Sequence, residues 1–262
     1  MSAIILRDEI VHYEVLGRGR PMLFLHGWVG SWRYWIPTMQ AASIAHRTYA
    51  LDLWGFGDSA KNPSCFSLEQ QLGLIEEFLE AMGLGKVVFV GHGLGAVLAL
   101  LFASRYPELV DRFMAVSMPL GNGSINLRMR NAQPVELAEW LLNPSPVTGP
   151  TVAEAAKTDV QAIRITLAEL SQLDLLQPLH GSTTPCLGVL GNNDPVTILP
   201  STETLASLPE TYHQLLFEES GHFPMLDETS KFNRLLSDFL GLASGDSPRQ
   251  LQLKEEWKRR VR

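Results

Sequence analysis

Two residues in the second half of the chain have the types and settings that acyl-transfer chemistry uses. Asp194 lies in GNNDPV, directly after the apolar run CLGVL, and His222 lies in ESGHFPMLD, directly after HQLLF. Such an acid and base normally follow a nucleophile on a sharp strand-to-helix turn, G-x-nucleophile-x-G. The turn VGHGLGA contains both flanking glycines, Gly91 and Gly95, but Gly93 stands where Ser, Cys or Asp is required. The attacking side chain is therefore absent.

Two backbone N–H groups are expected to remain available for a developing negative charge. In LFLHGWVGS a strand ends and a loop begins, and by position Trp28 supplies one donor, while Leu94, directly after residue 93, supplies the other. Backbone donors do not depend on the side chain, so the loss of a nucleophile leaves them intact. We assign the Trp28 ring to the pocket, whereas the spacing of Trp32 and Trp35 suits a helix packed into the core.

These residues support three interpretations. With Ser at position 93, the hydroxyl would attack a carbonyl, His222 would take its proton and Asp194 would orient His222. With Gly93 that covalent route is closed, whether the glycine is natural or engineered. The protein then binds a ligand without turnover, or uses His222 alone as a general base for proton abstraction or water activation. We therefore assign the covalent route only to a hydrolase ancestor of this protein.

Other polar residues near these motifs are given structural roles. His26 and His92 flank the expected pocket, and we interpret both as structural. Ser59 is predicted to cap a helix. Ser31 and Ser117 are the nearest spare hydroxyls, but neither lies in a nucleophile turn.

Alternating strand and helix patterns must position these residues, which indicates an α/β fold with a largely parallel sheet. Continuous apolar runs are typical of strands buried on both faces. Strands are predicted at 3–16 (two short strands), 22–26, 47–52, 86–90, 113–117, 186–190 and 213–217.

Helix signals lie between these runs. Ser67 with Gln70 predicts a capping box, and 95–106 is apolar nearly all round, which predicts a buried helix. A second capping box, Thr151 with Glu154, predicts one helix through about residue 176.

The chain is expected to divide into three parts. Residues 1–118 and 184–243 form the core, and the insertion 119–183 forms a helical lid over the carboxyl edge of the sheet, where ligands bind in such folds. In the tail, 244–262, the residues Leu253, Trp257 and Val261 share one helical face among basic residues. That pattern fits a membrane or partner helix, or a terminal helix that docks on its own domain or frays.

Together these motifs resemble the α/β-hydrolase superfamily, in particular its lid-bearing single-domain branch of esterases, carbon–carbon-bond hydrolases, haloperoxidase-like enzymes and haloalkane dehalogenases. The resemblance covers about residues 3 to 242 and rests on HGWVGSW, DLWGFGDS, VGHGLGA, GNNDPV and SGHFP. It implies a mostly parallel, twisted sheet of the eight-stranded type, with helices on both faces and an inserted helical lid. It also implies a small ester-like or carbonyl-containing substrate or ligand. The lack of Asp at position 93 argues against dehalogenation and epoxide opening by a covalent carboxylate.

Bulk properties restrict the remaining functions. The chain has 262 residues, 45% of them hydrophobic, and a net charge of −7. An acidic protein is a poor partner for nucleic acid, which binds basic surfaces. The two cysteines are not spaced as metal ligands, and no cofactor or metal is expected. Charged residues near the start do not match a signal peptide, and no apolar run reaches the ~18 residues of a membrane span. A cytoplasmic protein is expected, and its oligomeric state is left open.

Overall fold

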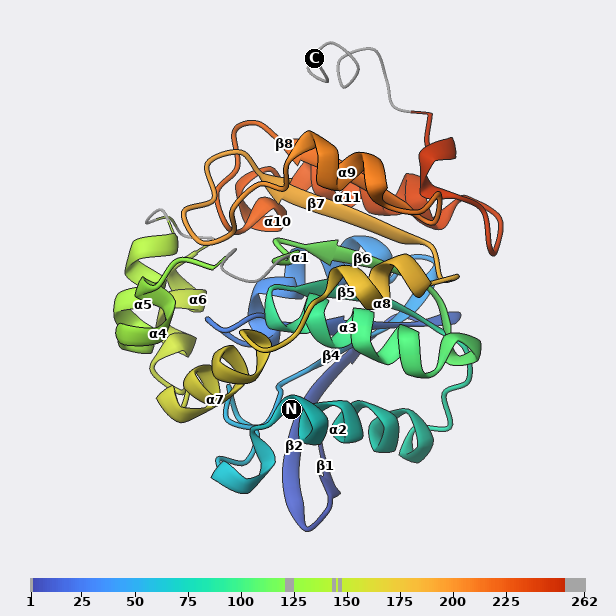
Figure 1. Cartoon of the computed structure of the whole chain (residues 1–262). Helices are drawn as coiled ribbons and strands as arrows, with labels where there is room; N and C mark the ends of the chain where they lie inside the picture. The colour runs from blue at the N-terminus through green and yellow to red at the C-terminus, as the bar shows by residue number, and fades with distance from the viewer. Residues whose placement is uncertain (1, 121–124, 143–144, 146–147, 253–262) are drawn as a thin grey trace.

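A computed structural model describes residues 2–120, 125–142, 145 and 148–252. Within them, one eight-stranded sheet has the order β1-β2-β4-β3-β5-β6-β7-β8 (Figure 1). The two pairings that involve β2 are antiparallel and all others are parallel, which confirms the predicted α/β fold. The strands are β1 (Ser2–Leu6), β2 (Glu9–Leu16), β3 (Arg20–Leu25), β4 (His46–Leu51), β5 (Val87–His92), β6 (Val110–Val116), β7 (Cys186–Gly191) and β8 (Tyr212–Phe217).

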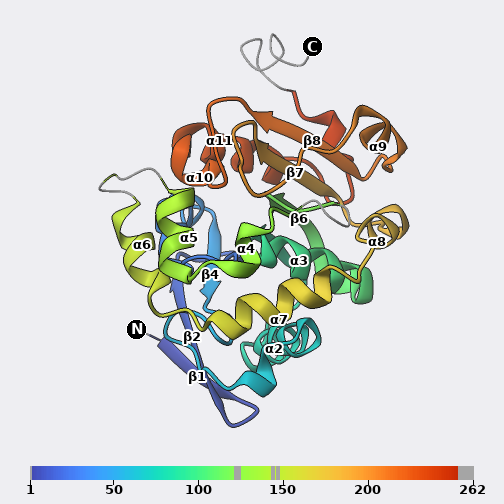
Figure 2. The same ribbon diagram turned by 60° about the vertical axis from the view of Figure 1, so that its left-hand side comes forward.

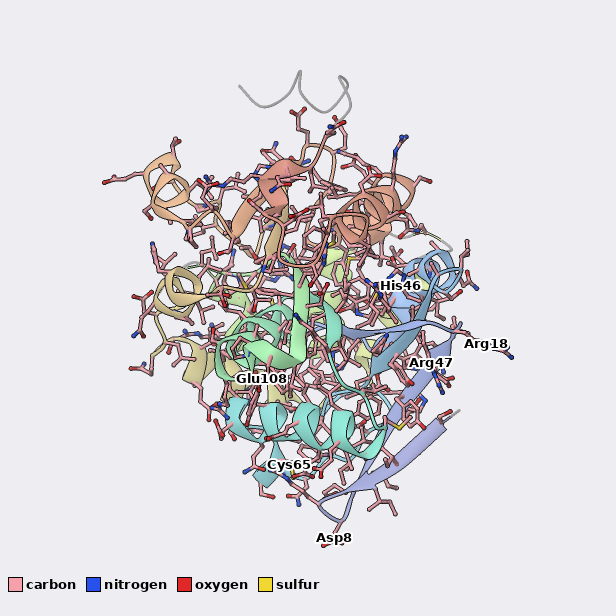
Figure 3. All side chains as sticks on the ribbon, turned by 90° about the vertical axis from the view of Figure 1, so that its right-hand side faces the viewer. Asp8, Arg18, His46, Arg47, Cys65 and Glu108 are labelled. Carbon is pink, nitrogen blue, oxygen red and sulfur yellow. The ribbon has the colours of Figure 1, made fainter. Side chains whose placement is uncertain are left out.

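The apolar runs become central strands because both faces of the sheet are covered. Every residue of β5 and β7 is buried, while β1 at the edge has alternating burial. Arg7 and Asp8, both with positive φ, form the tight β1–β2 turn, and Asp8 lies at its tip (Figure 3).

Helices cover the two faces of the sheet (Figure 1). α1 (Ile36–Ala42) packs against α11 (Thr229–Leu240), while α3 (Leu94–Arg105) packs against α2 (Leu68–Ala81) and α8 (Leu176–Gly181). The shorter elements are α9 (Thr202–Ser207), α10 (Pro224–Asp227), and the 3₁₀ helices η1 (Trp32–Trp35), η2 (Pro63–Cys65), η3 (Pro107–Leu109) and η4 (Pro248–Gln250).

Half of the first predicted capping box forms. The Ser67 hydroxyl accepts a hydrogen bond from the N–H of Gln70 at 3.2 Å and begins α2. The Gln70 side chain, however, accepts from the guanidinium of Arg7 instead of returning to Ser67. Arg7, which is distant in sequence, therefore replaces the Ser67 backbone N–H as the partner of the Gln70 side chain.

The segment between β6 and β7 holds α4 (Arg128–Asn131), α5 (Pro134–Leu141), α6 (Gly149–Ala155), α7 (Val160–Leu170) and α8. The prediction of one helix from 151 to about 176 is wrong, because α6 and α7 are separate and Thr151 lies inside α6. Asp159 explains the break. Its carboxylate caps α7 by accepting from Gln161 N, and its own N–H donates to the Gly55 carbonyl at 2.7 Å, so that N–H is not available to a helix.

Helices α6 and α7 contact the loops that follow β3 and β4. The Ser31 hydroxyl donates to the Glu154 carboxylate at 3.0 Å, and Asp159 bonds Gly55 as described. Figure 2 shows α4, α5, α6 and α7 together beside one end of the sheet. Helices α6 and α7 therefore lie against the loops at the carboxyl ends of β3 and β4.

In the tail, Ser247 caps η4, and the stripe Leu253, Trp257 and Val261 lies outside the described residues. None of the helices in the described ranges has the length and apolar character that a bilayer crossing requires.

Candidate functional site

The turn between β5 and α3 has the backbone that a nucleophile turn requires. Gly93 has φ +49° and ψ −109°, a conformation that strains residues with a side chain. A Cβ on Gly91 would overlap the Gly95 carbonyl oxygen, and a Cβ on Gly95 would overlap the Leu25 carbonyl oxygen. The two flanking glycines therefore permit the close backbone packing that the motif predicted.

The Trp28 ring borders the position above Gly93. A Cβ added to Gly93 would lie 3.2 Å from Cε3 and Cζ3 of Trp28, and 3.6 Å from the Cα of Gly27. The indole is buried, and its Nε1–H donates to Oγ1 of Thr166 at 3.0 Å. Because Thr166 belongs to α7, one side chain connects the turn to the inserted helices.

Asp194 and His222 meet as predicted from their positions in the sequence. His222 Nδ1 lies 2.9 Å from Asp194 Oδ2, and both side chains are almost fully buried. The other carboxylate oxygen accepts from the N–H groups of Val196 at 2.8 Å and Thr197 at 3.2 Å. A proton on Nδ1 leaves Nε2 as the basic nitrogen. No hydrogen bond joins Nε2 to any described residue.

The pKa of the Asp194 carboxyl reflects this pairing. Burial favours the neutral acid and would raise the pKa, but the charge and hydrogen bond of His222 oppose it, helped by the Val196 and Thr197 N–H groups, and lower the pKa to about 2. At neutral pH the carboxylate is ionised and able to stabilise an imidazolium.

The loops that carry Asp194 and His222 are joined directly to each other. A Cβ on Gly191 would overlap the carbonyl oxygen of Gly221, so the glycine allows the two loops to meet. The N–H of Asn193 donates to the Ser220 carbonyl at 3.0 Å, and the Gly221 N–H donates to the Asp227 carboxylate at 2.9 Å. These contacts fix the backbone of Asp194 relative to the backbone of His222.

The two predicted oxyanion donors are unpaired among the described residues. Neither the N–H of Trp28 nor that of Leu94 donates a hydrogen bond to a described partner. Their neighbours are engaged: Gly93 N donates to Val116 O at 2.9 Å, and Gly95 N donates to His26 O at 3.1 Å. The geometry is compatible with the oxyanion role, which stays a prediction.

The two histidines interpreted as structural are both fully buried. His26 Nε2 accepts from the N–H of Leu53 at 3.0 Å, and its Nδ1 bonds the Gly27 carbonyl at 2.7 Å. His92 bonds Tyr34 and the backbone of His222. Burial lowers the pKa of both imidazoles, that of His92 far below its usual range. Both rings are therefore neutral at pH 7.

The hydroxyl groups have other partners. Ser117 Oγ donates to the His222 carbonyl at 3.0 Å, and Ser31 bonds Glu154. The prediction that Ser59 caps a helix is wrong. Its hydroxyl donates to the Asp52 carbonyl at 2.6 Å and accepts from the N–H of His12 at 2.9 Å, because the folded loop brings these backbones together.

The sequence did not reveal a second buried His–Asp pair. His12 Nδ1 lies 2.9 Å from Asp52 Oδ2, and Asp52 also accepts from the N–H of Trp32 at 2.9 Å. Asp58 is near enough to complete a set of three metal-type donors, but its carboxylate is already paired with Lys157 at 2.9 Å. The pair therefore serves to tie β2, β4 and the loop after β3 together.

Comparisons with known proteins agree with this architecture. The model of the Alpha/beta hydrolase family matches residues 22–235. The putative carbamate hydrolase RutD of Yersinia enterocolitica is 26% identical over 271 residues, covering 94% of this chain and 97% of that protein. Mouse Epoxide hydrolase 4 is 33% identical over 112 residues, covering 41% of this chain and 31% of that protein, so the match spans less than a third of its length.

Solved structures share the fold at lower identity. The esterase EaEST from Exiguobacterium antarcticum has a TM-score of 0.81 at 18% identity, covering 92% of this chain and 99% of its own. A serine-to-glycine mutant of the N-acyl homoserine lactonase AidH, complexed with N-hexanoyl homoserine lactone, has a TM-score of 0.78 at 19% identity, covering 91% and 96%. With the family model matched along most of its length, the chain belongs to the alpha/beta hydrolase family.

Proposed function

We propose that this protein binds a small ester-like or other carbonyl-containing molecule above Gly93 and hydrolyses it without a covalent acyl-enzyme. The observation that carries the proposal is the Asp194–His222 pair, buried, oriented and with Nε2 of His222 unpaired among the described residues, beside a turn that contains no nucleophile.

The reaction uses water as the nucleophile. Nε2 of His222 removes a proton as the water oxygen bonds to the carbonyl carbon, and the N–H groups of Trp28 and Leu94 hold the oxygen that becomes negative. When the intermediate collapses, the bond to the leaving alkoxide breaks, and the imidazolium returns the proton to that oxygen. Asp194 stabilises the imidazolium between the two steps.

The names of relatives support the substrate class. A carbamate hydrolase, the pimeloyl-[acyl-carrier protein] methyl ester esterase of Vibrio vulnificus and the lactonase AidH are among the similar proteins. In one of these similar structures, an AidH mutant with glycine in place of a serine is complexed with N-hexanoyl homoserine lactone.

We assign the lid role to residues 119–183. Support comes from the contacts of α6 and α7 with the loops after β3 and β4, above all the bond from Trp28 to Thr166. A lid here would exclude bulk water and strengthen the electrostatic stabilisation of the intermediate.

The alternative is a ligand-binding protein without turnover. It is favoured by the Trp28 ring, which lies close to the position of the missing nucleophile and leaves limited room there. In that case Nε2 of His222 accepts a hydrogen bond from the ligand, and Asp194 orients the imidazole.

A turnover screen with His222→Ala as the paired variant separates these functions. Parent protein is tested on p-nitrophenyl esters, carbamates and lactones, and binding is followed by calorimetry. We expect turnover that falls about 10²–10⁴-fold in His222→Ala, the usual contribution of a general base. Turnover unchanged by His222→Ala refutes the proposal, and tight binding without any turnover establishes the alternative.

A fluorophosphonate probe tests the absence of a covalent route. We expect no labelling of the parent protein, because Gly93 offers no hydroxyl. Labelling at Ser117 or Ser31 would show that a different nucleophile operates and would overturn the site assignment.

A further inference from the structure

Tyr34 and His92 lie buried between the three loops of the candidate site. The N–H of Gly27, in the oxyanion loop, donates to the Tyr34 hydroxyl at 2.6 Å. That hydroxyl lies 3.0 Å from Nδ1 of His92, which directly precedes Gly93. Nε2 of His92 in turn lies 2.9 Å from the backbone carbonyl oxygen of His222. One unbroken chain of hydrogen bonds therefore joins the oxyanion loop, the nucleophile turn and the base loop.

The direction of every bond in this chain is determined by its two ends. The His222 carbonyl can only accept, so Nε2 of His92 carries the proton and Nδ1 is an acceptor. The Tyr34 O–H must then donate to Nδ1, while its oxygen accepts from Gly27. A neutral His92 satisfies both bonds, and burial, followed by the neighbouring His222, lowers the pKa of its imidazole far below neutrality.

Contacts between aromatic rings also restrict the positions of Tyr34, His92 and His222. The His92 ring centroid lies 4.7 Å from that of His222 and 4.6 Å from that of Phe223, and Tyr34 meets His92 edge-on at 5.6 Å. Ser117 supplies a second donor to the His222 carbonyl. The backbone of the base is thus held from two sides, by the end of β5 and the end of β6.

We infer that Tyr34 and His92 are positioning residues that set the His222 loop against the oxyanion donor of Trp28, on either side of Gly93. A carbonyl group that reacts there must reach the Trp28 N–H and the water held by His222 at once. The chain from Gly27 to His222 fixes that separation, because each of its links is short, buried and fully paired. The inference rests on the proposed role of His222, but its test needs no turnover.

Three substitutions of His92 separate a directed hydrogen bond from simple packing. Gln places an amide N–H near the position of Nε2 and can keep the bond to His222, whereas Asn reaches only the position of Nδ1, and Leu keeps neither. The readout is the proton NMR signal of the His222 Nδ1–H bonded to Asp194, and its rate of exchange with water. Thermal unfolding of each variant verifies the fold.

We expect the signal to persist in the parent and in His92→Gln. In His92→Asn and His92→Leu it should be lost, or exchange at least tenfold faster. Tyr34→Phe, which removes one oxygen, should also accelerate the exchange. Tyr49→Phe, at a buried tyrosine in β4, should not.

Parental exchange in His92→Asn and His92→Leu, or a loss in His92→Gln equal to that in His92→Leu, would overturn the inference. If the Leu variant does not fold, Tyr34→Phe decides, because unchanged exchange there is also contrary to the inference. A parent protein without turnover that still shows the expected pattern would remove the proposed function and leave the positioning roles standing.

Discussion

Replacing Gly93 with Ser restores the missing hydroxyl, and its cost can be worked out from the turn. Gly93 has φ +49°, and an added Cβ would approach the Trp28 ring to 3.2 Å, so the ring must move by a few tenths of an ångström. Backbone strain of this kind costs about 1–3 kcal/mol. For a domain of this size, that cost lowers the melting temperature by about 2–12 °C.

The same variant should gain ester hydrolysis. The introduced hydroxyl would not need a new base, because His222 is already bonded to Asp194 and the Trp28 and Leu94 N–H groups are unpaired among the described residues. In the serine protease subtilisin, removing the nucleophile costs about 10⁶-fold in kcat, which sets a ceiling for the gain. We expect a rise of at least about 10²-fold in p-nitrophenyl acetate hydrolysis, the lower end of a general base's contribution.

Matched variants make the result decisive. Gly93→Ala introduces the same strain without a hydroxyl, and His222→Ala in the Gly93→Ser background removes the base. Only Gly93→Ser with His222 intact should hydrolyse the ester and react with a fluorophosphonate. If Gly93→Ser melts like Gly93→Ala yet shows neither activity nor labelling, His222 is not directed at position 93 and the reasoning fails.

Three further predictions concern stability. Folding lowers the pKa of the Asp194 carboxyl from 3.8 to about 2, so the ionised carboxylate stabilises the fold above pH 4. This contribution is lost as the pH falls through 2. Urea unfolding should therefore show that the parent loses on the order of 2 kcal/mol more than Asp194→Asn between pH 7 and 2. Trp28→Phe removes the bond to Thr166 and shrinks a fully buried ring, so by urea unfolding it should cost more than the about 0.5–1.5 kcal/mol of the bond alone, whereas a cost near zero would mean that neither the bond nor the ring packing contributes. Glu154→Ala should lower the unfolding free energy by about 1–3 kcal/mol, because it leaves the buried Ser31 hydroxyl without its acceptor, whereas Glu139→Ala, at an exposed position on α5, should change little.

Much of the fold could be predicted because its signals are local. The central strands are continuous apolar runs, and such runs are stable only when helices cover both faces of a sheet. The helix error at 151–176 has the opposite origin. The pattern there is helical throughout, but Asp159 bonds Gly55, a residue far earlier in the chain, and that bond interrupts the helix.

The candidate site divides along the same line. Asp194 and His222 could be paired in advance, because each follows a parallel strand, and β7 and β8 prove to be neighbours in the sheet. The link from Tyr34 through His92 could not, since a tyrosine in η1 has no motif that names its partner. The prediction that Ser59 caps a helix was wrong for the same reason, because its hydrogen-bond partners come from other segments of the chain.

The sequence by itself determined the order of the strands, the presence of glycine at position 93, and the placement of Asp194 and His222 after neighbouring strands. These depend on side-chain type and on periodicity along the chain. Only the tertiary structure decided that the Trp28 ring borders Gly93, that Tyr34 and His92 join three loops, and that the inserted helices break at Asp159. Those features depend on contacts between segments far apart in the chain, which arise only after the core has packed.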